Sequence, residues 1–257
     1  MSEEPKKLFL LDAFALIFRS YYAFIKNPRI NSKGLNTSAM FGFTNTLLDV
    51  INRQKPTHLA VVFDFPAATF RNEIYPEYKA NRDETPEDIK LSVPWIKKII
   101  EAFNIPILEA KGYEADDVIG TLAKMAEKEG FVTYMMTPDK DFAQLVSDNI
   151  FMFKPPRMGN SSEILGPKEV CEKYELKDPI QVIDLLGLMG DAADNIPGIP
   201  GVGLKTAIKF IKQYGSIEEL LKNTADLKGK MKEKVEAGHD SAILSKVLAT
   251  IALDAPV

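Results

Sequence analysis

The chain has one cysteine, Cys171, and only two histidines, His58 and His239, among its 257 residues. One cysteine excludes an internal disulfide, a Cys-x-x-Cys redox pair and a cysteine-rich zinc site. Two histidines leave little for a histidine-based triad or a histidine-rich metal site. No apolar run approaches the ~18 residues of a membrane-spanning helix. Met1–Lys7 is short and polar, unlike a signal peptide. We therefore expect a protein of the reducing cytoplasm that does not enter a membrane.

Positive charge is not in excess, since 32 lysines and arginines accompany 36 aspartates and glutamates, for a net charge of −4. A nucleic-acid partner usually requires a basic face, so this balance at first argues against one. The distribution matters more than the sum, because nine acids gathered in one cation-filled site would leave the rest of the chain at +5. The 46% hydrophobic and 26% charged residues are typical of a globular protein of one or two domains.

Short, uninterrupted apolar runs indicate strands that are buried on both faces, as in a parallel sheet. Four such runs are Lys7–Leu11, Leu59–Phe63, Val132–Met136 and Ile150–Phe153. Between them lie stretches with helical periodicity, at Ser38–Ile51, Val93–Phe103 and Ala115–Lys128. The alternation predicts an α/β fold with a mostly parallel central sheet flanked by helices.

The pattern changes after residue 165, where helical segments follow one another closely and no further strand is indicated. These segments are Pro167–Tyr174, Pro179–Met189, Val202–Tyr214, Ile217–Leu221, Lys230–Ala237 and Asp240–Ile251. We expect an α/β core over residues 1–165 and a helical region over residues 166–257 that packs on it. Within the core, residues 66–94 form a charged, proline-interrupted insertion that is poor in core residues, and long excursions of this kind are commonly functional.

Acidic residues follow three of the apolar runs: Asp12, Asp64 and Asp139. The carboxyl ends of parallel strands line the ligand crevice of an open α/β sheet. Further acids stand at the ends of other expected elements: Glu114, Asp116, Asp117, Asp141, Asp191 and Asp194. Each alone is also compatible with helix capping, which favours acids in a first helical turn. The whole set is not, because nine converging carboxylates repel one another unless cations neutralise them.

Oxygen ligands without histidine or cysteine select Mg²⁺ or Mn²⁺. Two such cations ~4 Å apart serve in-line displacement at phosphorus, where one generates hydroxide and the other stabilises the leaving oxygen. The reaction then needs no protein nucleophile. The carboxylates therefore predict a phosphodiester hydrolase that uses two metal ions.

Glycines and lysines near residue 200 indicate where a nucleic-acid backbone docks. Three glycines permit a tight hairpin between two helices within about residues 180–214: Gly198, Gly201 and Gly203. Free N–H groups where the second helix begins, near Val202, point at an anion. Lysines recur along that helix at helical spacing: Lys205, Lys209 and Lys212. A solvated surface face would also explain these lysines.

The insertion carries two cations three residues apart, Lys79 and Arg82, which would share one face of a helix. In a water-poor site they would hold the scissile phosphodiester and offset its developing charge. Arg19, Arg71 and Tyr78 are further candidates for contact with DNA, although packing in the core is the favoured role of the tyrosine.

Four motifs occur in order along the chain: Phe70-Arg71 with Tyr75-Pro76-Glu77-Tyr78-Lys79-x-x-Arg82, Glu114-Ala115-Asp116-Asp117, Asp139-Lys140-Asp141, and Gly190-Asp191-x-x-Asp194-Asn195-Ile196-Pro197-Gly198. Together they resemble the 5′ nuclease superfamily, and within it the 5′→3′ exonuclease domain of bacterial DNA polymerase I, which is related to flap endonucleases. The resemblance extends from about Lys7 to about Asp254.

The resemblance implies a structure-specific nuclease that acts at nicks, 5′ ends and 5′ flaps of double-stranded DNA, in primer removal and repair. It implies a PIN-like core, a helical arch formed by the insertion, and a helix–hairpin–helix region. One cation would be held by Asp64, Glu114, Asp116 and Asp117, the other by Asp139, Asp141, Asp191 and Asp194, while Asp12 orders bound water. Lys79 and Arg82 would contact the scissile phosphate, and K⁺ would bridge the Gly198–Gly203 hairpin to DNA.

We expect a monomer in the bacterial cytoplasm, associated with the nucleoid, that is either freestanding or joined to a polymerase. A DNA-structure-binding protein without catalysis would lack metal ligands, and all nine acids are present. An RNA-cutting nuclease of a related fold would lack the hairpin and the insertion. A phosphoryl-transfer enzyme with Asp12 as nucleophile would carry Asp-x-Asp, whereas Ala13-Phe14 follows here. The balance between exonuclease and flap endonuclease action stays open, as do flap length and the choice of a DNA or RNA primer.

Overall fold

The computed structural model describes residues 6–155 and 161–257, so residues 1–5, where no signal peptide is expected, lie outside it. A six-stranded sheet with the order β3-β2-β1-β4-β5-β6 forms the centre. Its strands are β1 (Lys7–Asp12), β2 (His58–Val62), β3 (Ile107–Leu108), β4 (Val132–Met136), β5 (Ile150–Lys154) and β6 (Glu163–Leu165). The first five are parallel and β6 is antiparallel to β5. The four expected strands and the mostly parallel sheet are confirmed.

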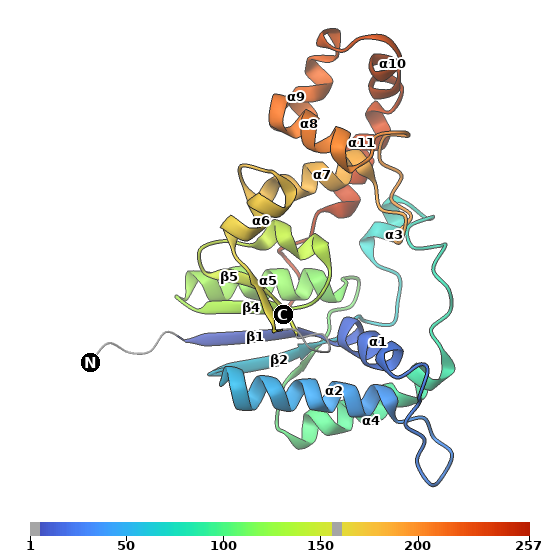
Figure 1. The fold of residues 1–257 in the computed structure, drawn as a ribbon, viewed down its shortest axis with the longest axis vertical. Coiled ribbons are helices and arrows are strands. Elements are labelled where there is room, and N and C mark those ends of the chain that lie inside the picture. The colour runs from blue at the N-terminus through green and yellow to red at the C-terminus, as the bar shows by residue number, and fades with distance from the viewer. Residues whose placement is uncertain (1–5, 156–160) are drawn as a thin grey trace, which may run out of the picture.

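Alternating residues of β1 face two apolar clusters, as the strand period of two requires. Phe9 and Leu11 pack with helices on one face, and Leu10 packs with the helix on the other. The helices of the core are α1 (Ala13–Ala23), α2 (Ser38–Asp49) with the π-helical turn Val50–Gln54, α4 (Glu87–Ala102) and α5 (Ala115–Lys128). In Figure 1, α2 and α4 lie on one side of β1 and β2, and α5 lies on the other. Helix α1 was not expected from the sequence.

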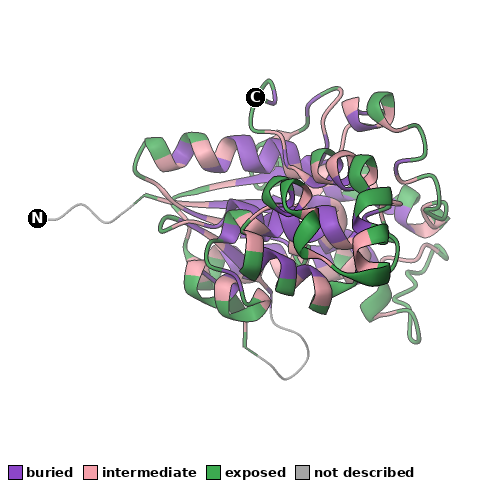
Figure 2. Cartoon of the chain, turned by 90° about the horizontal axis from the view of Figure 1, so that it is seen from above, coloured by how far each residue is buried: buried purple, intermediate pink, exposed green. Residues whose placement is uncertain are grey.

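The helical region stands on the α5 side of the sheet, coloured yellow to red in Figure 1. It contains α6 (Pro167–Tyr174), the 3₁₀ turn Pro179–Gln181, α7 (Val182–Met189), α8 (Leu204–Tyr214), α9 (Ile217–Lys222), the 3₁₀ turn Thr224–Asp226, α10 (Gly229–Ala237) and α11 (His239–Ala249). Leu186, Phe210 and Leu248 from this region join the same buried cluster as Val118 of α5. Figure 2 shows the buried segments gathered at the centre of the molecule. The helical region therefore shares its core with the sheet.

The insertion is more closely packed than its composition suggests. Only α3 (Phe70–Ile74) and the start of α4 are helical, and turns and extended backbone connect them. Arg71, Tyr78 and Ile89 are buried, so the expectation of a segment poor in core residues was wrong. Across the described ranges, no helix combines the length and the apolar character needed to cross a membrane.

Candidate active site

Three neighbouring parallel strands end at or just before an aspartate. Asp12 is the last residue of β1, Asp64 comes shortly after β2, and Asp139 comes shortly after β4. Because β1 lies between β2 and β4, these three side chains meet at the carboxyl edge of the sheet. All three line one cavity of about 580 Å³. The structure thus brings these aspartates together as the sequence predicts.

Neighbouring donors orient the carboxylates at this edge. The Ala15 N–H donates to Asp12 Oδ1 at 3.1 Å, which caps α1, and the Thr137 hydroxyl donates to Asp12 Oδ2 at 2.9 Å. The Ala115 N–H, in the first turn of α5, donates to Asp64 Oδ1 at 2.9 Å. The side chains are therefore held before any ligand arrives.

The start of α5 adds two acids to the same cavity, Glu114 and Asp116. Glu114 is buried, with Lys79 Nζ 2.7 Å from its Oε1 and the Tyr78 hydroxyl 3.0 Å from its Oε2. Asp116 Oδ1 accepts the N–H of Asp117 at 2.7 Å. Five of the nine predicted ligands therefore line one cavity.

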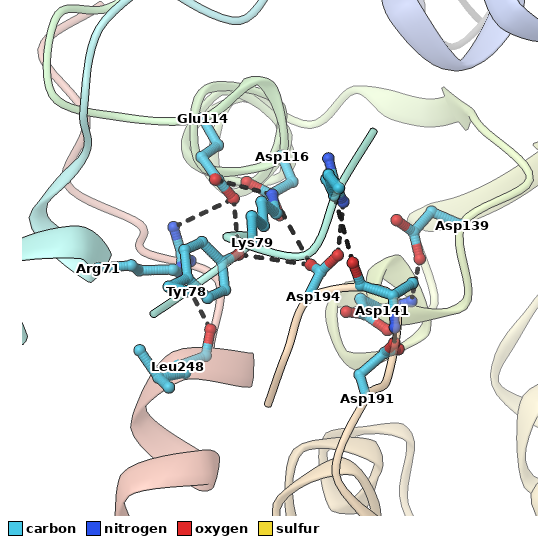
Figure 3. Close-up of polar contacts among 12 residues, drawn as sticks. Arg71, Tyr78, Lys79, Glu114, Asp116, Asp139, Asp141, Asp191, Asp194 and Leu248 are labelled. Atoms are coloured by element: carbon cyan, nitrogen blue, oxygen red, sulfur yellow. Dashed lines mark hydrogen bonds and ion pairs between the residues drawn. The ribbon is translucent and has the colours of Figure 1, made fainter. Parts of the chain in front are cut away.

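A second group of acids lies beside this cavity, formed by Asp141, Asp191 and Asp194 (Figure 3). Asp141 sits in a short 3₁₀ helix, Lys140–Leu145, and the other two sit on the loop that follows α7. Asp141 Oδ1 is buried and accepts no hydrogen bond from the part of the chain that the structure describes. An unpartnered buried carboxylate oxygen is costly in a protein interior and is a ready ligand for a cation.

Glycines make the loop after α7 possible. Gly190 and Gly198 have φ values of +71° and +61°, which side-chain-bearing residues rarely adopt. A Cβ on Gly190 would lie 2.4 Å from the Ile196 carbonyl oxygen, and one on Gly198 would lie 2.3 Å from the Gly190 nitrogen. An antiparallel bridge between Asp191 and Ile196 closes the loop. Asp191 and Asp194 therefore lie on a tight turn that backbone hydrogen bonds hold closed.

The insertion docks directly on this loop. The Lys79 N–H donates to the Asp194 carbonyl at 2.9 Å, and the Asn195 side-chain amide donates to the Glu77 carbonyl at 2.7 Å. Lys79 has a φ of +58°, so it lies in a turn. The expectation that Lys79 and Arg82 share a helix face was therefore wrong, because the turn and not a helix aims both side chains at Asp194.

Burial and mutual repulsion raise the pKa values of three of these acids. Burial, followed by repulsion from Asp64, raises the pKa of Asp12 to about 7. Burial, followed by repulsion from Asp139, raises the pKa of Asp141 to about 7. Burial and neighbouring carboxylates also raise the pKa of Asp116 well above its ordinary value. The protein alone does not neutralise this cluster.

The side chains of this cluster are of the kind that bind hard divalent cations, although their present positions do not form a metal site. In residues 6–155 and 161–257, no group of three or more histidine, cysteine, aspartate or glutamate side chains is arranged to hold a metal ion. All the side chains that gather here offer oxygen, as Mg²⁺ and Mn²⁺ prefer. The raised carboxylate pKa values and the unpartnered Asp141 Oδ1 are what an added cation would relieve.

Two predicted roles do not agree with the structure, those of Asp117 as a metal ligand and Arg71 as a DNA contact. Asp117 is fully buried and Arg71 is 1% exposed. The guanidinium donates to both Asp117 oxygens, at 2.7 and 2.8 Å, and the N–H groups of Glu114 and Ala252 donate to the same carboxylate. Protein donors thus occupy Asp117, and Arg71 cannot reach a duplex.

Tyr78 is likewise withdrawn from the surface, with 4% of its area exposed. Its hydroxyl donates to Glu114, and its ring lies 4.9 Å from Lys79 Nζ. It therefore supports the cavity wall, the packing role that the sequence favoured, and its contact with DNA stays a prediction that the burial of the ring does not support.

The glycine-rich hairpin joins α7 to α8, which begins at Leu204 with Gly203 as its N-cap. Gly201 has a φ of +81°. The hairpin is tied to α11, since the Ser241 hydroxyl donates to the Gly198 carbonyl at 2.7 Å. Lys205 and Lys209 are exposed on α8. These positions suit a phosphate contact, which stays a prediction.

Arg19 is not among the residues that line the cavity of the acids. It is half-buried on α1 and lines a second cavity, which also includes Lys154. Its predicted contact with DNA is not tested by this placement.

Two functional candidates were missed by sequence reasoning, Lys140 and Thr137. Lys140 Nζ bonds Asp191 and lies 3.7 Å from Asp141 Oδ1. Burial opposes it, yet these acids raise the pKa of Lys140, and the lysine in turn lowers the pKa of Asp191 against the effect of burial. The only available signal was position: Lys140 stands between two predicted ligands, and Thr137 follows directly on β4.

Known families match both parts of the chain. The 5′-3′ exonuclease N-terminal resolvase-like domain matches residues 7–175, and the 5′-3′ exonuclease C-terminal SAM fold matches residues 177–257. The chain belongs to the 5′-3′ exonuclease family. The predicted nuclease activity is confirmed at the level of this family.

Individual relatives agree with this family. DNA polymerase I of Bacillus subtilis is 44% identical over 256 residues, which are 99% of this chain and 29% of that protein. The 5′-3′ exonuclease of Aquifex aeolicus is 43% identical over 218 residues, which are 85% of this chain and 73% of that protein. The chain thus spans less than a third of the polymerase that it matches.

Solved structures of the 5′-3′ exonuclease fold resemble this one. A bacteriophage T5 5′-exonuclease with bound zinc has a TM-score of 0.77 at 23% identity, covering 95% of this chain and 89% of that one. The catalytic core of Rad2 in complex with DNA has a TM-score of 0.61 at 18% identity, covering 98% of this chain and 81% of that one. At these identities the likeness concerns the fold, and it confirms the expected α/β core.

Proposed function

We propose that this chain hydrolyses DNA phosphodiester bonds at 5′ ends and 5′ flaps and depends on two divalent cations, Mg²⁺ or Mn²⁺. One observation carries the proposal: acids from three strand ends and the start of α5 line a cavity that Lys79 and Arg82 also line. Carboxylates that bind cations and cationic side chains that bind phosphate thus face the same space. The bacteriophage T5 flap endonuclease in complex with DNA and metal ions has the same fold, with a TM-score of 0.76.

Divalent cations in this site would activate a water molecule for attack on phosphorus and stabilise the leaving oxygen. Asp64, Glu114 and Asp116 would hold one cation, and Asp12 would orient the attacking water. The other cation would take Asp139, Asp141, Asp191 and Asp194. Asp117 leaves this set because its oxygens already accept bonds from Arg71.

Lys79 and Arg82 would hold the scissile phosphate and balance the charge that develops on it. Their present partners, Glu114 and Asp194, lie on either side of the boundary between the two groups of acids. The exposed lysines of α8 would bind the duplex backbone beyond the cut. K⁺ at the Gly198–Gly203 hairpin would bridge carbonyl groups to a phosphate.

The relatives that carry this domain support a proposal for its cellular role. In DNA polymerase I the matching region is joined to a much longer chain. We propose that this chain acts in primer removal and repair, with a polymerase region linked to it in the native protein. It would work as a monomer on nucleoid DNA in the bacterial cytoplasm.

The test is cleavage of a flap substrate labelled at its 5′ end, in Mg²⁺ and in excess EDTA. Release of a flap-length fragment indicates endonuclease action, whereas release of mono- and dinucleotides indicates exonuclease action. Cleavage in excess EDTA would contradict the metal-dependent reaction. Equal cleavage of an unnicked duplex without ends would contradict the structural specificity.

A further inference from the structure

Cationic side chains of the protein itself occupy the acids that are proposed to bind metal. Lys79 Nζ lies 2.7 Å from Glu114 Oε1 and 3.7 Å from Asp194 Oδ2, and Arg82 also bonds Asp194. Lys140 bonds Asp191 and lies 3.7 Å from Asp141 Oδ1. No group of three or more of these acids in the described ranges is arranged to hold a metal ion. The internal cations and a metal ion therefore compete for the same oxygens.

Lys79 and Arg82 belong to the insertion and have a proposed role in binding phosphate. Lys140 lies outside the insertion, so that role does not explain its position. It belongs to the turn that carries Asp139 and Asp141, and its side chain reaches Asp191 on the loop after α7. It thus joins two segments that are 51 residues apart in the sequence. Its side chain is 40% exposed, so it can leave this position for solvent without disturbing the core.

We propose that Lys140 is an internal counter-ion that holds Asp141 and Asp191 together and yields them to a divalent cation, which frees its ammonium group for the phosphate of the substrate. This inference rests on the proposed metal-dependent function. Asp141 Oδ1 supports it independently, because this buried oxygen accepts no hydrogen bond from the described chain even though Lys140 is close. Lys140 therefore satisfies the acids only in part, and a cation with shorter contacts to more oxygens displaces it.

Displacement by a metal ion changes what Lys140 contributes to the stability of the fold. Without metal, the lysine offsets repulsion among the acids and stabilises the fold. With metal bound, the cation takes over that role, so the lysine no longer contributes to stability. A lysine with a purely structural role would stabilise both states equally. This difference separates the two roles without any measurement of activity.

The first measurement is the acylation rate of individual lysines in the wild-type protein, followed by mass spectrometry with and without saturating Ca²⁺. Calorimetry on the same sample establishes that Ca²⁺ binds. We expect labelling of Lys140 to become several-fold faster on binding, because its ammonium leaves the acids. Lys222, paired with Glu219 at 2.7 Å on α9, is the matched control and should not change.

The second measurement compares Lys140→Met with Lys222→Met. In chelator, Lys140→Met should melt several degrees below the wild type, and in saturating Ca²⁺ the difference should disappear. Ca²⁺ affinity should rise roughly two- to five-fold, the factor that corresponds to one partly exposed ion pair. Lys222→Met should change neither quantity.

The outcomes distinguish this inference from the function on which it rests. Ca²⁺ binding with unchanged or slower labelling of Lys140 would overturn the displacement and leave the metal-dependent nuclease intact. An equal loss of melting temperature with and without Ca²⁺ would also overturn it, since it would show a structural ion pair. A protein that binds no divalent cation would overturn both.

Discussion

Arg71 and Asp117 form a buried, two-pronged ion pair whose nitrogen–oxygen distances are 2.7 and 2.8 Å. The same guanidinium donates to the carbonyls of Leu248 and Thr250, at 2.9 and 2.8 Å. One side chain of the insertion therefore joins the start of α5 to the end of α11. This arrangement places the acids of α5 beside the turn that carries Lys79.

Replacing Arg71 should cost stability, because Asp117 would stay buried without its partner. We expect Arg71→Met to lower the free energy of unfolding by about 3–5 kcal/mol. The measurement is equilibrium unfolding in urea. Arg53→Met is the matched control: Arg53 pairs with Asp49 at 2.8 Å, its side chain is 75% exposed, and its loss should cost at most about 0.5 kcal/mol. If Arg71→Met instead bound DNA more weakly at unchanged stability, Arg71 would be a DNA contact.

Asp116→Asn should abolish cleavage while the metal-free protein keeps or gains stability. Burial and neighbouring carboxylates raise the pKa of Asp116, so removing its charge relieves repulsion. Melting in chelator, together with a cleavage assay, tests both parts. A fall of many degrees in melting temperature would make Asp116 a structural residue.

Asp194→Asn should also abolish cleavage, but its metal-free stability should fall slightly. The difference arises because Asp194 accepts ion pairs from Lys79 and Arg82, which would lose a partner. Melting of both asparagine variants in the same chelating buffer compares them directly. A gain in stability on removing Asp194 would show that these pairs contribute nothing.

The pH dependence of stability in the metal-free protein should reveal the raised pKa of Asp12. Its pKa is raised from 3.8 to about 7 in the folded protein, so its stabilising effect is full below pH 4 and is lost as the pH rises through 7. Asp12→Asn should therefore match the wild type below pH 4 and become increasingly the more stable protein as the pH rises from 4 to 8. Urea unfolding across this range in chelator is the measurement. A stability difference that does not change with pH would contradict the raised pKa.

Ca²⁺ should support DNA binding without turnover. Its larger and looser coordination shell would neutralise the acids but would not align water and phosphate as Mg²⁺ does. A binding titration and a cleavage assay in each cation test this directly. Turnover in Ca²⁺ at the Mg²⁺ rate would show that alignment by the metal is unimportant.

Substitutions at Lys79 and Lys205 should distinguish an effect on the cleavage rate from an effect on DNA binding. Lys205→Ala should weaken binding and lower its salt slope by about 1, since one phosphate contact releases about one counter-ion, while the rate at saturating enzyme recovers. Lys79→Ala should bind nearly normally, and its saturated single-turnover rate should fall by roughly 10²-fold or more.

The control for this pair is Lys212→Ala, on the same helix as Lys205 but paired with Glu175, which should change the salt slope less. The measurements are single-turnover rates at several enzyme concentrations and binding titrations at several salt concentrations. Full recovery of the Lys79→Ala rate at saturation would limit the role of the insertion to binding.

Local patterns predicted helices in both regions closely. Pro167–Tyr174 and Ala115–Lys128 were predicted with the bounds that the structure has, because proline at the helix start and apolar periodicity act over a few residues. The strands β3 and β6 escaped prediction because two or three residues carry no measurable period. Helix α4 begins at Glu87 and not at Val93, since its first turn is charged and Pro94 lies inside it.

The sequence by itself determined that the acids meet, because Asp12, Asp64 and Asp139 follow apolar runs and parallel strands end at one edge of the sheet. Only the tertiary structure decided which acid serves which purpose. Asp117 looks like a ligand until Arg71, 46 residues away, is found on both of its oxygens. Lys140 looks incidental until Asp191, 51 residues away, is found beside it. The sequence shows which residues are charged. The ion-pair partner of each charged residue depends on which distant segments the packed core brings into contact.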